Sequence, residues 1–212
     1  LLGGDYWVDI DQFADRDFND TLIAQNDLNR PNKLVKECDV FGWDYHMNTR
    51  LVNVFGQFEK KWSKVEAYVG ASLAQTGFWR EGNMRNGRFP ETSMGKGEMH
   101  SFFNFGMKGG GLYKLSGRHF IAANAAFLSR PPATNVSYLS PRVHDGTIPG
   151  LTSEKVYTGD IGYVVRFPRV KGRATLYYTK IYDQVWSRSF YHDEYRPIVN
   201  YNMTGVDQIN RG

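Results

Sequence analysis

Side chains that could perform catalysis or hold a metal are scattered along the chain. The five histidines are far apart in the sequence, whereas zinc sites typically have closely spaced ligands. Carboxylates in the connectors are too many and too dispersed to define an acid–base pair, and the order of residues defines no Ser-His-Asp set. The sequence therefore predicts a protein that is not an enzyme and that needs no cofactor or metal.

Two local patterns resemble known binding sites, but one lacks residues that its site requires and the other lies in the wrong structural position. The run from Asp9 to Asp17 begins like a calcium loop, yet Phe13 and Ala14 stand where a ligand and a glycine are expected. A solvated acidic loop is the favoured interpretation, and a weak calcium site is the alternative. The glycine-rich stretch 106–111 lies inside an expected strand, not between a strand and a helix, so it does not predict a phosphate-binding loop.

Aromatic residues in the long connectors are the best candidates for contact with a ligand. Aromatic rings on an exposed face can stack on a ligand, and they can equally form the aromatic belt of a membrane protein. The belt is favoured for Trp79 and Trp186, which adjoin strand ends. The ligand-binding candidates are Trp43, Tyr45, Phe89, Tyr138, Tyr191 and Tyr195.

Composition narrows the class of protein further. The 212 residues are 41% hydrophobic and 15% aromatic, and no window of 18 apolar residues exists for a transmembrane helix. The net charge of +4 comes from Lys and Arg spread through turns and loops, so no nucleic acid partner is expected. The single Cys38 excludes an internal disulfide framework.

Residues that alternate with period two predict antiparallel strands. In the segment 64–78, Val65, Ala67 and Val69 fall on one face, and Glu66 and Tyr68 fall on the other. Alternation of this kind predicts seven strands, at 50–60, 64–78, 98–114, 120–127, 154–167, 173–185 and 198–212. For the strand at 173–185 the alternation does not say which face is apolar.

The connectors between these strands are alternately short and long. Tight turns are expected at 60–63, 115–118 and 168–172, and polar stretches at 81–97, 131–153 and 191–197. Outer-membrane barrels have short turns on the periplasmic face and long loops outside. We therefore expect an all-β fold, with the antiparallel up-and-down strands of a transmembrane β-barrel in 49–212 and an extracellular loop region in 1–48.

Several stretches together resemble the barrel of TonB-dependent outer-membrane receptors of the Bacteroidetes type. They include 1–18 (LLGGDYWVDIDQFADRDF), 25–31 (QNDLNRP), 84–90 (MRNGRFP), 95–100 (GKGEMH), 139–142 (LSPR), 147–151 (TIPGL), 172–184 (GRATLYYTKIYDQ) and 203–206 (MTGV). The resemblance spans nearly the whole chain, and 1–212 is then one middle-to-late segment of a barrel domain that lacks the plug domain.

The resemblance implies a large outer-membrane barrel that imports a scarce nutrient. A small nutrient ligand would bind the extracellular loops, and the plug, driven through TonB, would open a path. Outer-membrane lipid would be a partner, and a surface lipoprotein partner and the identity of the ligand stay open. The first alternative is a soluble or surface glycan-binding β-domain, and the second is an outer-membrane enzyme on a small barrel.

Overall fold

A computed structural model of the chain describes residues 20–23, 25–31, 33–191 and 198–212. Its strands are β1 (Tyr45–Lys61), β2 (Val65–Gly82), β3 (Gly95–Lys96), β4 (His100–Lys114), β5 (His119–Arg130), β6 (Glu154–Arg166), β7 (Lys171–Tyr191) and β8 (Ile198–Arg211). One short helix, α2, covers Thr134–Ser137. In the part of the chain so described, no helix is long and apolar enough to cross a membrane.

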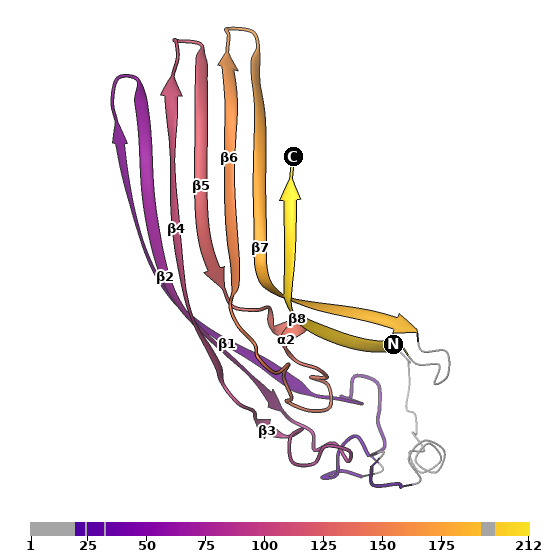
Figure 1. Cartoon of the computed structure of the whole chain (residues 1–212). Helices are drawn as coiled ribbons and strands as arrows, with labels where there is room; N and C mark the ends of the chain where they lie inside the picture. Colours follow the sequence, from indigo (N-terminus) through magenta and orange to yellow (C-terminus); the bar gives the residue numbers. More distant parts are fainter. Residues whose placement is uncertain (1–19, 24, 32, 192–197) are drawn as a thin grey trace. The chain divides into compact units, whose positions relative to one another are not determined.

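The prediction of an all-β antiparallel fold is confirmed. The strands form one open sheet in the order β1-β2-β4-β5-β6-β7-β8, with β3 paired to β2. Neighbours in the sheet follow one another in sequence, apart from β3, which pairs only with β2. The short connectors after β1, β4 and β6 lie together at one end of the strands (Figure 1).

Several predicted strand boundaries were wrong, since β1 begins at Tyr45, before the expected residue 50, β5 runs to Arg130, past 127, and β7 runs to Tyr191, past 185. The strand expected at 64–78 continues as β2 to Gly82, and the two-residue β3 makes eight strands where seven were expected. Both differences have one cause, because Glu81 and Gly82 pair with Lys96 and Gly95 of β3. Backbone pairing across a connector leaves no hydrophobic alternation in such short segments, so the sequence contains little signal for it.

The described residues divide into two compact units. The first, here called the loop unit, contains 20–50, Gly77–His100 and Tyr138–Ile148. The second, here called the sheet unit, contains Leu51–Thr76, Ser101–Ser137 and the described part of Pro149–Gly212. Most of the buried apolar side chains belong to the loop unit: Val35, Phe78, Trp79, Tyr138 and Ile148.

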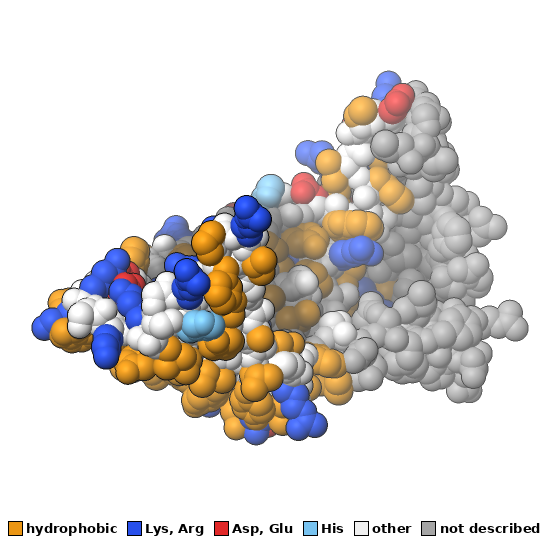
Figure 2. Space-filling model, turned by 90° about the horizontal axis from the view of Figure 1, so that it is seen from above, with side chains coloured by type: hydrophobic (Ala, Val, Ile, Leu, Met, Phe, Trp, Pro, Cys, Tyr) orange, Lys and Arg blue, Asp and Glu red, His pale blue; other side chains and the backbone are white. Residues whose placement is uncertain are grey.

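Pairing in the sheet unit separates its side chains into two faces. Residues directly opposite one another share a face, and the register joins Tyr113 to Ile121, Ile121 to Tyr163, and Tyr163 to Ala174. The face so defined, here called the apolar face, carries Phe103, Phe105, Met107, Tyr113, Ile121, Ala123, Ala125, Phe127, Tyr157, Ile161, Tyr163, Ala174, Leu176 and Tyr178. Hydrophobic side chains are seen gathered over the strands in Figure 2.

The same register assigns the strand whose faces the alternation left open. Leu176 of β7 lies opposite Ile161 of β6, and Tyr178 lies opposite Gly159. The even-numbered residues from Ala174 to Tyr178 therefore belong to the apolar face. Thr175, Tyr177 and Thr179 lie on the other side of the sheet.

The opposite face, here called the polar face, carries a connected set of hydrogen bonds. Tyr68 Oη donates to Asn124 Oδ1 at 3.0 Å, and Asn124 Nδ2 donates to Asp160 Oδ1 at 3.0 Å. Lys114 pairs with Glu66 at 2.6 Å between Nζ and Oε1. These contacts join four strands, β2, β4, β5 and β6, on the side away from the apolar residues.

Two compensating irregularities interrupt the pairing of β7 with β8. Between the pairs Ile181–Gln208 and Gln184–Val206, three steps along β7 match two along β8. Between Gln184–Val206 and Trp186–Met203 the excess is reversed. Each strand thus has one extra residue. A residue with positive φ lies in each of these two stretches, namely Asp183 in β7 at 57° and Gly205 in β8 at 71°.

Adjacent glycines of β4 meet different surroundings and allow a matched test. A Cβ on Gly110 would press against Asn124 Oδ1 and lie 2.9 Å from Tyr68 Cε1, whereas a Cβ on Gly109 would meet only Tyr68 O, at 3.5 Å. We expect Gly110→Ala to destabilise the protein by about 1–3 kcal/mol through overpacking, and Gly109→Ala to be neutral or stabilising. Urea unfolding followed by tryptophan fluorescence measures both, and equal midpoints would contradict the assignment of the polar face.

Candidate ligand-binding loop unit

The long connectors of the loop unit are tied to one another by backbone hydrogen bonds. Leu28 N donates to Arg85 O at 2.7 Å, and Gly87 N donates to Gln25 O at 2.9 Å. Asp145 N donates to Thr92 O at 3.0 Å, which joins the segment 138–148 to the segment 83–94. Three stretches of chain that are distant in sequence therefore form one packed body.

Arg80 lies at the centre of this body with 1% of its surface exposed. Its Nε donates to Pro141 O at 2.6 Å, and its Nη1 donates to Ser93 O at 2.7 Å. Its guanidinium carbon lies 5.3 Å from the centre of the Tyr45 ring. One buried cation thus holds both long connectors, because a guanidinium has several donors in a fixed plane.

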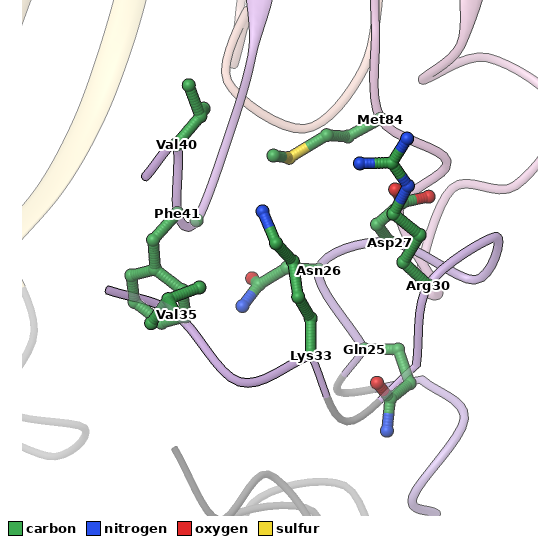
Figure 3. A pocket seen from close by; sticks show the side chains of 10 residues that line it. Gln25, Asn26, Asp27, Arg30, Lys33, Val35, Val40, Phe41 and Met84 are labelled. Carbon is green, nitrogen blue, oxygen red and sulfur yellow. The ribbon is translucent and has the colours of Figure 1, made fainter. Parts of the chain in front are cut away.

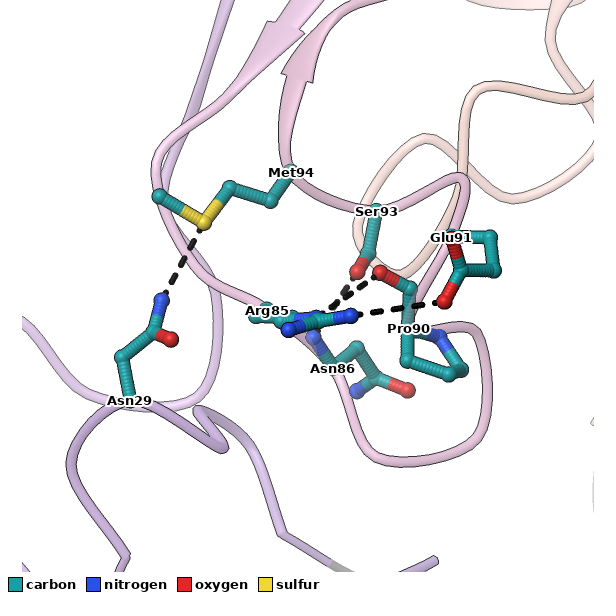
Figure 4. Close-up of polar contacts among 7 residues, drawn as sticks. All are labelled: Asn29, Arg85, Asn86, Pro90, Glu91, Ser93 and Met94. Carbon is teal, nitrogen blue, oxygen red and sulfur yellow. Dashed lines mark hydrogen bonds and ion pairs between the residues drawn. The ribbon is translucent and has the colours of Figure 1, made fainter.

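A second arginine orders the turn between β2 and β3 (Figure 4). Arg85 Nε donates to Pro90 O at 3.1 Å, and its Nη2 pairs with Glu91 Oε1 at 3.3 Å. Asn86 N donates to Ser93 Oγ at 2.8 Å, which closes the turn from inside. Glu91 is exposed, so the carbonyl and hydroxyl contacts contribute more to this turn than the ion pair does.

The structure places four of the six predicted aromatic residues in the loop unit. Trp43 is 45% exposed, with the Arg142 guanidinium 4.3 Å from its ring centre. Phe89 is half-buried, and its ring lies 4.6 Å from that of His144. Trp43 and Phe89 therefore both contact the segment 138–148, and the half-buried Tyr45 is linked to it through Arg80.

Tyr138 differs from the other three because it is buried, with 2% of its surface exposed. Its ring packs 6.1 Å from Phe78 and 6.2 Å from His100, between ring centres. Burial raises the pKa of the Tyr138 phenol. In this arrangement Tyr138 builds the core of the loop unit, and Trp43, Tyr45 and Phe89 are the candidates with accessible surface.

The remaining two candidates are not placed. Tyr191 ends β7, and its side chain lies outside the described part of the structure. Tyr195 lies outside the described residues altogether, as does the acidic run from Asp9 to Asp17.

The expectation that Trp79 belongs to an exposed aromatic belt is wrong. Its side chain is 7% exposed, and both the guanidinium carbon of Arg50 and Nζ of Lys96 lie 5.0 Å from the ring centre. These cation–π contacts hold the indole inside the loop unit. The strand extension to Gly82, which sequence analysis missed, is the reason that Trp79 does not lie at a strand end.

A small pocket opens beside the buried Val35 (Figure 3). Charged side chains of Asp27, Arg30 and Lys33 line it together with Val40, Phe41 and Met84. Its volume is about 50 Å³, which has room for water or a small ion and not for a nutrient molecule of drug size. A ligand of drug size therefore does not fit in this pocket.

No group of three or more His, Cys, Asp or Glu side chains is arranged to hold a metal ion in the described ranges. Comparison with family models, with curated proteins and with solved structures finds no match for this chain. The site must therefore be judged on its own residues.

The sequence contains no signal for the role of Arg80, on which the loop unit depends. An arginine directly after Phe78 and Trp79 is expected to be exposed at the end of a strand, because arginine is rarely buried without partners. Its partners here are backbone carbonyls of Pro141 and Ser93, and carbonyls leave no signal in a sequence. The aromatic residues around it were found because their side chains carry the signal themselves.

Removal of the Arg80 guanidinium should loosen the loop unit. Arg80→Met leaves two carbonyls without their donor, at a cost of about 1–3 kcal/mol for each buried unsatisfied group. We expect faster hydrogen exchange in 83–97 and 138–148, measured by mass spectrometry. The matched control is Arg88→Met, since Arg88 is exposed on the same connector. Equal exchange in the two variants would contradict the central role of Arg80.

The loop unit should also loosen in mild acid through His144. Its half-buried Nδ1 accepts from Gly146 N at 2.9 Å, and burial lowers its pKa, with Asp145 opposing and Arg80 adding to the shift. The neutral ring thus contributes stability above the ordinary pKa of about 6.5, and this is lost as pH falls through the lowered value. Below that range a protonated ring cannot accept the bond.

Hydrogen exchange of 138–148 between pH 8 and pH 5, corrected for intrinsic rates, measures this effect. We expect His144→Asn to remove the pH dependence, because an amide oxygen accepts at every pH. His46→Asn, at an exposed histidine, should leave the dependence unchanged. Constant protection of the native protein across this range would refute the role of His144.

Proposed function

We propose that this chain forms part of the wall and outer loops of a transmembrane β-barrel, in a TonB-dependent outer-membrane transporter that imports a scarce nutrient. The observation that carries the proposal is the exposed apolar face of the sheet unit. Phe103 is 64% exposed, Ile161 53% and Leu176 70%. A sheet in water buries such a face against a second layer, whereas a barrel wall leaves it to lipid.

The polar face fits the interior of such a barrel. Hydrogen-bonded polar side chains, among them Tyr68, Asn124 and Asp160, cover the side opposite the apolar residues. Barrel strands alternate apolar residues outside with polar residues inside. The apolar face of the sheet therefore suits lipid, and the polar face suits the interior of a barrel.

A row of aromatic rings crosses four neighbouring strands near the end that leads into the long connectors. Ring centres lie 5.1 Å apart for Phe105 and Phe127, 4.8 Å for Phe127 and Tyr157, and 5.6 Å for Tyr157 and Tyr182. Phe167 lies beyond the other end of β6. The ten residue steps from Tyr157 to Phe167 span about 33 Å of strand, or about 25 Å across a membrane at a usual tilt.

The open edges of the sheet support the same proposal. In the described part of the chain β1 and β8 each have one neighbour. In lipid an unpaired edge costs several kcal/mol for each backbone group, so a spanning sheet must close with further strands. A barrel completed by other strands of the protein satisfies both edges at once.

In this proposal the long connectors are extracellular loops and the short connectors are periplasmic turns. A nutrient ligand contacts the accessible rings of Trp43, Tyr45 and Phe89, and a plug outside this chain, driven through TonB, opens the path. Outer-membrane lipid covers the apolar face, and a surface lipoprotein is a further partner. This chain contributes wall and binding surface, not catalysis.

Membrane insertion is tested by placing a charge on each face. We expect Ile161→Lys to destabilise the folded protein in lipid by about 2–4 kcal/mol, and Leu112→Lys to be tolerated because Leu112 lies on the polar face beside Glu66. Both are aliphatic-to-lysine changes. The measurement is the fraction of heat-modifiable, folded protein in isolated outer membranes.

The location of the native protein decides between the proposal and its alternative. A heat-modifiable band in the outer-membrane fraction supports the transporter. A soluble band with equal tolerance of Ile161→Lys and Leu112→Lys would overturn it and favour a glycan-binding β-domain.

A further inference from the structure

The apolar face carries a shallow groove across β4, β5 and β6. Gly109, Ala125 and Gly159 lie opposite one another on three neighbouring strands and form its floor. Phe127 and Tyr157 stand on one side of this floor, and Val69, Met107 and Tyr178 also line the groove. Its volume is about 580 Å³, and it is open to the surroundings along its length.

The glycines on the floor are not required by crowding or by backbone conformation. A Cβ on Gly109 or on Gly159 would meet one backbone oxygen at an ordinary 3.5 Å and no side chain. Neither residue has a positive φ. Since glycine weakens a strand, the absence of side chains here requires another reason, and the open groove supplies one.

One end of the groove leads into a charged pocket. Tyr157 and Tyr178 line both, and the second pocket, of about 500 Å³, adds Lys155, Lys180 and Asp183. Lys155 Nζ pairs with Asp183 Oδ2 at 2.8 Å, and Lys180 Nζ lies 4.1 Å from the centre of the Tyr182 ring.

Arg211 adds a third cation to this end of the groove. It lies opposite Tyr178 in the pairing of β7 with β8, so it shares the face of Lys180. Asp207 is two residues from Ile209, the partner of Lys180, and so lies on the same face. The three cations and two carboxylates leave an excess of one positive charge beside the row of aromatic rings.

We propose that this groove binds one phosphate-bearing membrane lipid, with an acyl chain over Gly109, Ala125 and Gly159 and the phosphate beside Lys180 and Arg211. The inference rests on the proposed membrane function and names the lipid class that the wall recognises. The groove is apolar along its floor and ends in cations beside the row of aromatic rings. This arrangement matches a lipid whose acyl chain is apolar and whose anionic group lies at the depth of the headgroups. A neutral lipid would leave the one excess positive charge without a counter-charge.

The test is native mass spectrometry of the whole protein in detergent, with phosphatidylglycerol or with neutral diacylglycerol added. We expect adducts with phosphatidylglycerol only. Lys180→Gln and Arg211→Gln should each reduce adduct formation about fivefold. Lys171→Gln, at an exposed lysine of the short-connector end, should not.

A second pair of variants tests the floor of the groove. Gly159→Val fills it with a residue that favours strands, and we expect a loss of adducts without loss of folded protein. Gly172→Val is the matched control, because a Cβ on Gly172 would meet nothing within 4 Å and this glycine lies outside the groove.

Three results would each overturn the lipid site. They are equal adducts with the neutral lipid, adducts unaffected by Gly159→Val, and a dimer mass in place of lipid adducts. The heat-modifiable band and the response to Ile161→Lys report on the barrel independently. Failure of the lipid site with those results intact would therefore leave the proposed function standing.

Discussion

The structure depends on a single-layer sheet whose two faces need different surroundings. Tyr68, Asn124 and Asp160 bond to one another on one face, while Phe103 and Leu176 stand uncovered on the other. Burial of hydrophobic side chains away from water is favourable. Exposure of the apolar face to water is therefore unfavourable, whereas the polar face can be solvated. Register makes this separation strict, because a slip of one residue would exchange the two faces.

The loop unit is held together differently, because its long connectors are not organised by the pairing of long strands. Backbone polar groups in long connectors need partners when they are buried. Arg80 provides donors to two connectors at once, and the aromatic rings of Tyr138 and Phe78 exclude water beside it. Around this core Trp43 is exposed, and Tyr45 and Phe89 are half-buried.

The sequence predicted the parts of the fold whose signal lies in side-chain alternation. The long strands and tight connectors were found in this way, because one face of each strand is apolar. The short β3, the extension of β2 to Gly82 and the burial of Trp79 were missed, since backbone pairing and contacts distant in sequence produce them. The faces of β7 needed the register, because Tyr177 and Tyr178 suit either side.

The paired irregularities at Asp183 and Gly205 have a consequence for how this protein can change in length. Each strand of the hairpin holds one extra residue, and together they return the strands to their original pairing. Loss of one residue alone would shift every later pair, whereas loss of both would restore a plain ladder. Insertions and deletions in this pair of strands are therefore tolerated together, and the part beyond the irregularities can vary while the rest of the sheet keeps its pairing.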